Sequence, residues 1–225
     1  AFCNDYEVYI FAIFGKDGKV PYEWDERIHY HAELKWDCRI RKRIQKCFKP
    51  FKRYVKENQI DLVFLMENHP ALTVSPVRFF TKAKYVFCDH GALINEQEKK
   101  DITAFRFWAS LISHKTVTLT EQNRQDYIRR FHMNPKKVQS IYNWIAPEVL
   151  ECRGEYDHTS KKIITVGRFS EEKGYDMLVE VAKRVLTVHP DWEWHLYGTG
   201  DTLEEIRESI EKNHLTSQVI FKGNV

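Results

Sequence analysis

Short apolar runs alternate with amphipathic segments along the whole chain. In its first two thirds the strand-like runs are residues 7–14, 61–66, 84–89, 115–119 and 137–143, and the segments between them include 39–57, 70–80, 101–113 and 121–131. The apolar runs are nearly continuous in valine, isoleucine, leucine and phenylalanine, as in parallel strands that are covered by helices on both faces. We therefore expect a doubly wound α/β domain over residues 1–145.

A second alternation follows a segment that shows no periodicity. Residues 146–160 have mixed polarity and contain Pro147 and Gly154, which is typical of a linker between domains. After it, strand-like runs at 162–167, 192–198 and 219–225 alternate with helical segments at 175–189 and 203–212. The sequence therefore predicts a second doubly wound unit over residues 161–225. Three strands are few for a finished domain, so we expect this unit to be truncated at its carboxyl end.

Two patterns locate the helices of this second unit. The segment 175–189 carries two adjoining rows of apolar side chains at helical spacing, which we expect to form its buried face: Met177, Val181 and Val185, and Leu178, Ala182 and Leu186. Thr202 and Glu205 stand in front of an amphipathic run with the spacing of a capping box. We therefore expect the second helix to begin at Thr202, with its side chain as the cap.

Composition and cysteine usage are those of an ordinary cytoplasmic protein. Hydrophobic residues make up 43% and charged residues 30% of the chain, and no apolar run approaches the roughly 18 residues that a membrane span needs. The first residues lack the basic start and the cleavage site of a signal peptide. The five cysteines are widely scattered, without the paired short spacings of a zinc or redox site, and we expect them to be reduced.

Positive charge is concentrated in one segment. Residues 39–57 contain nine Lys or Arg and one Glu, whereas the whole chain has a net charge of only +3, which argues against a nucleic-acid partner. Apolar side chains lie among these cations: Ile40, Ile44, Cys47, Phe48, Phe51 and Val55. An amphipathic basic helix of this kind could lie on an anionic membrane surface. It could equally be a packing helix with a solvated charged face, and both interpretations stay open.

The run VGRFSEEKG carries the most informative chemistry. A predicted strand ends at Gly167, Arg168 follows at once, and Lys173 stands just before an amphipathic helix. A guanidinium, an ammonium group and the amino end of a helix together make a binding site for a phosphate or diphosphate that needs no metal. The alternative is that both cations decorate a solvated turn. The run matches neither a Walker loop nor a GxGxxG fingerprint.

From Lys162 onward the sequence resembles glycosyltransferase family 4, a group of retaining GT-B-fold enzymes. The shared pattern is a strand, Gly-Arg, four residues and Lys-Gly, followed in order by LYGTGD and VIFKGNV. The resemblance implies two Rossmann-like domains that face a cleft, and a nucleotide diphosphate sugar whose distal phosphate is held by Arg168 and Lys173. Fixed cations would stabilise the charge that develops on the leaving diphosphate, so no metal or other cofactor is expected.

Glycine loops after the predicted strands complete the implied nucleotide site. The resemblance places Gly167, Gly198 and Gly200 in nucleotide-binding loops, and it places Gly223 and Val225 in the wall around the nucleobase. Glycine lets a backbone or a ligand approach closely, so Gly198 and Gly200 could also form a tight turn between a strand and a helix. Gly223 and Val225 could likewise be a simple strand end.

His90 is the predicted catalytic residue of the first domain. It follows the strand-like run at 84–89, and members of the resembled family carry a histidine there that approaches the donor sugar and supports an oxocarbenium-like transition state. A single histidine can also be purely structural. The neighbouring Cys88 and Asp89 do not make a metal set or a catalytic triad with His90.

The resemblance implies a hexosyltransferase in cell-surface polysaccharide or glycolipid synthesis. We expect it to transfer a sugar, with retention, from a UDP- or GDP-sugar to a glycan or polyprenyl-linked acceptor at the inner face of the membrane. The family's first strand and its paired glutamates would lie outside the chain, so we expect this fragment to be inactive. The alternatives are a GT-B-fold epimerase or phosphorylase, and a non-catalytic peripheral membrane module.

Overall fold

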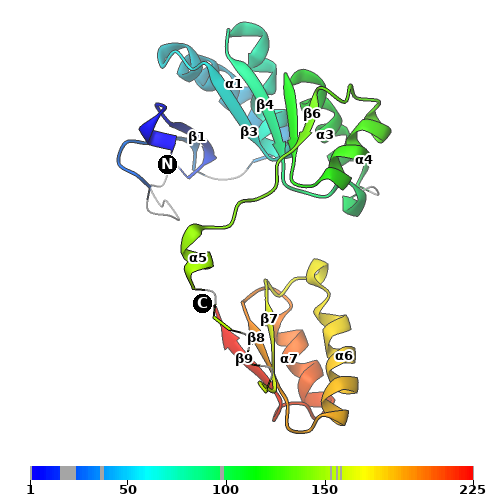
Figure 1. Ribbon diagram of the computed structural model, residues 1–225. Helices are drawn as coiled ribbons and strands as arrows, with labels where there is room; N and C mark the ends of the chain where they lie inside the picture. Colours follow the sequence, from blue (N-terminus) through cyan, green and yellow to red (C-terminus); the bar gives the residue numbers. More distant parts are fainter. Residues whose placement is uncertain are drawn as a thin grey trace. The chain divides into compact units, whose positions relative to one another are not determined.

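The chain folds into two compact units, residues 1–146 (unit 1) and 147–225 (unit 2) (Figure 1). The computed structural model describes residues 2–15, 24–35, 38–96, 99–152, 154–155, 157 and 159–224. Each unit has its own hydrophobic core, formed around parallel strands and the helices that follow them. The two units are therefore described one at a time.

The described residues of unit 1 form two parallel sheets. Strands β1 (Tyr9–Phe14) and β2 (His29–Leu34) form a pair, and β3 (Leu62–Met66), β4 (Lys84–Asp89), β5 (Lys115–Thr118) and β6 (Val138–Ser140) form a four-stranded sheet in sequential order. The helices are α1 (Ile40–Glu57), α2 (Asn68–Val74), α3 (Lys100–Ile112) and α4 (Glu121–Phe131). Three short 3-10 segments are η1 (Phe2–Asn4), η2 (Ser75–Phe80) and η3 (Leu93–Glu96).

The helices of unit 1 cover one face of the four-stranded sheet. The register pairs Val63 with Tyr85, and these side chains are buried against residues of α1 to α4. Side chains on the opposite face of β3 are exposed: Leu62 by 46%, Phe64 by 57% and Met66 by 46%. In the described residues, helices thus cover one face of this sheet, whereas the apolar runs predicted helices on both faces.

The basic segment forms helix α1, and its apolar side belongs to the core. Cys47, Phe51 and Val55 are buried in the core of unit 1, where the Phe51 ring meets the Phe11 ring of β1, and the helix continues through Pro50. The Tyr54 hydroxyl donates to the carbonyl oxygens of Ile10 (3.4 Å) and His29 (3.1 Å), which ties α1 to both strands of the small sheet. The apolar face that was considered for membrane contact is therefore a packing face, and only the charged face is exposed.

Strand β2 was not predicted. Its side chains alternate between Tyr30, Ala32 and Leu34 on one side and polar His29, His31 and Glu33 on the other, which gives only a weak apolar signal. Parallel pairing with β1, in a register that runs from Tyr9 opposite His29 to Phe14 opposite Leu34, supplies the missing stabilisation, because buried backbone groups need hydrogen-bond partners.

In its described residues, unit 2 contains a three-stranded parallel sheet, and a helix follows each of the first two strands. Strands β7 (Lys162–Val166), β8 (Glu193–Tyr197) and β9 (Val219–Gly223) are in sequential order, and α6 (Tyr175–Val188) and α7 (Leu203–Lys212) follow the first two (Figure 1). A 3-10 turn, η4 (Glu171–Lys173), leads into α6. A short helix, α5 (Pro147–Glu151), occupies part of the segment that was predicted to be a linker.

Two predictions about the helices of unit 2 need correction. Helix α6 buries Tyr175, Val179, Ala182 and Leu186, but Met177 is 66% and Val181 48% exposed. Only one of the two apolar rows therefore faces the core, because each step of one residue turns a side chain by about 100° around the helix.

The capping box at Thr202 does not form. Thr202 precedes α7, but its side chain accepts no capping hydrogen bond, and its φ of −93° and ψ of 5° differ from the extended conformation usual for a capping residue. Its backbone N–H donates instead to the Phe169 carbonyl at 3.2 Å. Thr202 therefore joins α7 to the loop after β7.

Candidate functional site

The turn between β7 and α6 presents the two predicted phosphate-binding cations. Arg168 lies two residues after the end of β7, and Lys173 ends η4 just before Gly174, whose φ of +66° favours a glycine. Both side chains are exposed, and neither forms a hydrogen bond or ion pair with another residue in the described part of the chain. A guanidinium and an ammonium group are thus available at the two ends of one six-residue turn.

Two aromatic side chains, Phe169 and Tyr175, fix the backbone around Arg168. Phe169 is fully buried, and its ring stacks on Tyr175 with the ring centroids 4.1 Å apart. The Tyr175 hydroxyl donates to the Gly167 carbonyl at 2.9 Å, so the first residue of α6 fixes the end of β7. The turn is therefore pre-formed, while the Arg168 side chain stays free to bind a ligand.

The loop at Gly198 and Gly200 supports this turn from the neighbouring strand. A Cβ atom on Gly198 would lie 2.0 Å from the Gly167 carbonyl oxygen, and one on Gly200 would lie 2.2 Å from the Phe169 carbonyl oxygen. The Phe169 N–H donates to the Thr199 carbonyl at 3.0 Å. Close packing of two backbones thus explains both glycines, and their contact with a nucleotide stays a prediction.

A third loop reaches the same edge of the sheet. The Gly198 N–H donates to the Gly223 carbonyl at 2.7 Å, and Gly223 has a φ of +74° with no atom near the position of a Cβ. The carboxyl ends of β7, β8 and β9 therefore meet, which is where open α/β sheets bind ligands. Val225, the other residue predicted for the nucleobase wall, lies outside the described residues.

Two hydroxyl groups add to the polar character of the turn. In the described ranges, Ser170 Oγ and Thr202 Oγ1 are buried atoms without a hydrogen-bond partner, and both residues adjoin Phe169. Glu171 and Glu172 are exposed in the same turn, so the site has no large excess of positive charge. Phosphate binding here would depend on where the individual donors stand, because the local net charge is small.

A buried charge cluster lies directly before His90 in unit 1. Asp89 and Arg106 are almost completely buried, and Arg106 Nε lies 3.0 Å from Asp89 Oδ2. The Tyr127 hydroxyl also donates to Asp89 Oδ2. Burial raises the pKa of Tyr127 well above its ordinary value, and the nearby Asp89 carboxylate adds to this shift, so Tyr127 remains a protonated donor.

The backbone on both sides of His90 is fixed by this cluster and by Asn123. The Gly91 N–H donates to Asp89 Oδ1 at 3.1 Å, and Asn123 Nδ2 donates to the Gly91 carbonyl at 2.9 Å. A Cβ atom on Gly91 would lie only 2.1 Å from Arg106 Nη2. The imidazole of His90 itself is 42% exposed. The loop is therefore rigid at its backbone and offers the His90 ring to a ligand.

Glu67 is a candidate that the sequence analysis missed. It follows β3 as His90 follows β4, and the two strands are paired, so both side chains stand at the same edge of the sheet. Glu67 Oε1 lies 3.8 Å from His90 Nδ1, and Glu67 has a φ of +66°, which is rare for a residue with a side chain. The rule that parallel strands end together would have found Glu67 beside His90.

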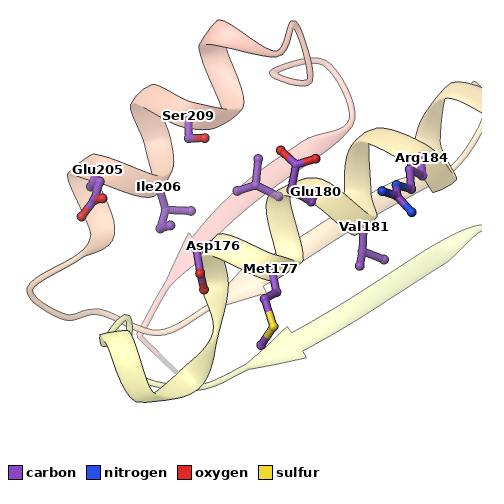
Figure 2. A pocket seen from close by; sticks show the side chains of 9 residues that line it. Asp176, Met177, Glu180, Val181, Arg184, Glu205, Ile206 and Ser209 are labelled. Carbon is purple, nitrogen blue, oxygen red and sulfur yellow. The ribbon is translucent and has the colours of Figure 1, made fainter.

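Unit 2 also contains a groove that is separate from the predicted site. It lies between α6 and α7 and has a volume of about 570 Å³ (Figure 2). Asp176, Met177 and Glu180 line it from α6, and Glu205 and Ser209 line it from α7. No residue predicted to contact the nucleotide belongs to this groove, and its carboxylates would repel a diphosphate.

Sequence profiles of two families match the chain. The profile of Glycosyltransferase Family 4 matches residues 4–149, and that of Glycosyl transferases group 1 matches residues 153–225. The chain belongs to glycosyltransferase family 4. The family predicted from VGRFSEEKG and the loops that follow it is therefore confirmed.

Curated relatives are longer than this chain. An uncharacterized glycosyltransferase of Haemophilus influenzae is 24% identical over 96% of the chain and 60% of its own length. The N-acetylgalactosamine-N,N'-diacetylbacillosaminyl-diphospho-undecaprenol 4-alpha-N-acetylgalactosaminyltransferase of Campylobacter jejuni is 24% identical over 77% of the chain and 49% of its own length. The chain thus spans about half to three fifths of these two relatives.

Solved structures confirm the predicted fold. Sucrose-phosphate synthase from Thermosynechococcus elongatus superposes with a TM-score of 0.73 and 16% identity, over 99% of this chain and 61% of the other. HepE of Anabaena, in complex with UDP-glucose, superposes with a TM-score of 0.66 and 14% identity, over 88% of this chain and 56% of the other. The α/β architecture with parallel sheets is of the GT-B type.

Proposed function

We propose that this protein is a retaining glycosyltransferase that uses a nucleotide diphosphate sugar, a UDP- or GDP-sugar, as donor. The observation that carries the proposal is the β7–α6 turn, where Arg168 and Lys173 have no side-chain partner among the described residues and stand on a pre-formed backbone at the carboxyl edge of a parallel sheet. The complex of HepE with UDP-glucose supports a donor of this class for a protein of the same fold.

In the proposed reaction, the two cations bind the diphosphate of the donor. Breaking the bond between sugar and phosphate leaves additional negative charge on the diphosphate, and fixed cations stabilise charge that develops in the transition state. Arg168 offers a planar fork that matches two phosphate oxygens, and Lys173 adds a compact point charge. Since these two groups neutralise the leaving group, the proposed reaction needs no metal ion.

His90 is proposed to contact the donor sugar as its bond to the diphosphate breaks. A ring that is partly exposed on a fixed backbone can stabilise an oxocarbenium-like transition state with little reorganisation. The Campylobacter jejuni relative is named as acting on an undecaprenol-linked substrate, which supports a glycan or polyprenyl-linked acceptor. We place the reaction in cell-surface polysaccharide or glycolipid synthesis, at the cytoplasmic side of the membrane.

Steady-state kinetics of the complete enzyme carrying Arg168→Ala test this proposal. We expect kcat/KM for the nucleotide sugar to fall by roughly 10²–10³-fold, the scale of losing one preorganised stabilising donor. Lys183→Ala is the matched control, because Lys183 is exposed on α6 two turns beyond the site and should leave the kinetics unchanged. Turnover by Arg168→Ala at the rate of the control would contradict the assignment.

A further inference from the structure

A pair of exposed phenylalanines adjoins the basic helix of unit 1. Segment η2 ends in Phe79 and Phe80, which are 67% and 51% exposed, whereas Val77 in the same segment is completely buried. Burial of Val77 anchors the segment and leaves the two rings at the surface. They supply the exposed apolar side chains that α1 lacks, since the apolar face of α1 is packed in the core.

Direct contacts join these rings to the cations of α1. The rings of Phe80 and Phe48 meet edge to face with centroids 5.6 Å apart, and Lys52 Nζ lies 4.9 Å from the centroid of the Phe80 ring. Arg78 Cζ lies 5.7 Å from the centroid of the Phe79 ring. Each exposed ring therefore has a cation beside it, and α1 and η2 form one continuous surface.

Positive charge dominates this surface. Lys49 is exposed three residues before Lys52 on α1, and Lys82 is exposed two residues after Phe80. Within the described ranges, none of the side chains of Lys49, Lys52, Arg78 and Lys82 is ion-paired with a carboxylate. Unpaired cations around exposed aromatic rings are complementary to a surface that is anionic outside and apolar beneath.

The charge extends beyond η2. Burial lowers the pKa of Lys137, and the Arg78 guanidinium lowers it further. The pKa of His114 is also lowered, first by burial and then by the positive charges of Arg78, Lys84 and Lys137. These cations therefore lie close enough together to influence one another. Asp61, whose carbonyl accepts from the Lys84 N–H, is an exposed acidic residue at the edge of this group.

We propose that unit 1 docks on anionic lipid bilayers through an aromatic–cationic surface made of Lys49, Lys52, Arg78, Phe79, Phe80 and Lys82. The two phenyl rings enter the boundary between headgroups and acyl chains, and the cations bind lipid phosphates at the same depth. The long aliphatic stems of the lysines reach past the rings, so their charges stay at the headgroup level. This proposal concerns the surface of unit 1 and does not depend on sugar transfer.

Vesicle co-sedimentation of the whole chain tests the proposal. We expect binding to vesicles of phosphatidylcholine with about one third phosphatidylglycerol, and a loss of at least tenfold in affinity for the Phe79→Ser/Phe80→Ser double variant, because two apolar side chains no longer enter the bilayer. Phe64→Ser is the matched control. Phe64 is 57% exposed but lies on the sheet face opposite the helices, so its replacement should leave binding unchanged.

Three outcomes would overturn the proposal. They are no binding of the folded wild-type chain to the anionic vesicles, equal binding by the double variant, and an equal loss in Phe64→Ser. Polyuridylate is added as a competitor. If it displaces the vesicles completely and binds the wild type and the Phe79→Ser/Phe80→Ser variant equally well, the surface is assigned to nucleic acid instead.

A second pair of variants keeps the test decisive if the double phenylalanine variant does not fold. Lys52→Glu/Arg78→Glu should weaken binding at least tenfold and make it less sensitive to salt, whereas Arg130→Glu, a change of an exposed cation on α4, should not. Hydrogen exchange of the wild-type chain should slow over residues 75–84 when anionic vesicles are added. Unchanged exchange in this segment would contradict the proposed docking.

Discussion

The loop after β4 and the turn after β7 each leave a parallel strand and present one candidate functional side chain, yet they are held by different means. Around His90 the support comes from side chains, since buried Asp89 is bound by Arg106, Tyr127 and the Gly91 N–H. Around Arg168 the Tyr175 side chain contributes, but the backbone also packs closely against a second loop, where only glycine leaves enough room.

This difference predicts which substitutions each site tolerates. The His90 loop should lose its conformation when a buried charge loses its partner, because an uncompensated charge in the core destabilises the fold. The Arg168 turn should lose its conformation when a methyl group is added at a close backbone contact. Changes of surface charge should leave that conformation intact. Substitution of the exposed cations in the turn should therefore change ligand binding and leave the free energy of unfolding unchanged.

Arg106→Ala is expected to have the largest effect. Its loss leaves Asp89 buried without its cation and should destabilise the chain by about 3–5 kcal/mol, measured by urea unfolding. Burial raises the pKa of the adjacent Cys88 thiol to about 11, so alkylation of Cys88 at pH 8 should be slow in the wild type and faster in the variant. Arg129→Ala is the control, because its side chain is 68% exposed in an ion pair with Asp126 and should cost less than about 1 kcal/mol. Equal stability of the two variants would contradict the claim that the His90 loop depends on the buried Asp89–Arg106 pair.

Gly198→Ala should have the next largest effect, confined to unit 2. At a φ of +135° and with its Cβ 2.0 Å from the Gly167 carbonyl oxygen, an alanine must shift the backbone, at a cost on the order of 1–3 kcal/mol. Hydrogen exchange should speed up in β7 and β8 but not in β4. Gly154→Ala is the control, since no atom lies within 4 Å of its Cβ position. Normal exchange in Gly198→Ala would show that the backbone contact does not hold the turn.

His90→Ala should have the smallest effect on stability, and in the complete enzyme it should lower turnover. We expect kcat to fall roughly 10- to 100-fold, the scale of losing one hydrogen bond to a charged group, with KM little changed, because the contact should strengthen in the transition state. The urea midpoint should stay that of the wild type, since the ring is partly exposed and the loop is held by Asp89 and Asn123. An effect confined to KM would contradict the proposed role.

Much of the element order could be predicted from the sequence. The predicted helices at 121–131 and 203–212 coincide with α4 and α7, and the predicted strand at 84–89 coincides with β4, because their apolar spacing is regular and their ends are marked by polar residues. Strand β2 could not be predicted in this way, since half of its side chains are polar and its stability comes from pairing with β1.

The supports of the candidate site were harder to predict than its exposed residues. Arg168 and Lys173 stand within six residues of each other, so a short motif reveals them. The cluster behind His90 joins Asp89 on β4, Arg106 on α3 and Tyr127 on α4, and no local pattern relates three residues so far apart in the chain. The exposed row at Met177 and Val181 was mistaken for core because amphipathic spacing does not say which of two adjoining rows faces the sheet.

The central claim is that Arg168 and Lys173 bind a diphosphate without a metal ion, and titration calorimetry with UDP in the presence of EDTA tests it most directly. We predict that the wild-type chain and Lys183→Ala bind UDP under these conditions, and that Arg168→Ala/Lys173→Ala binds at least roughly 100-fold more weakly, since two charge-assisted contacts are lost. Binding by the double variant with wild-type affinity, or loss of wild-type binding on adding EDTA, would contradict the account.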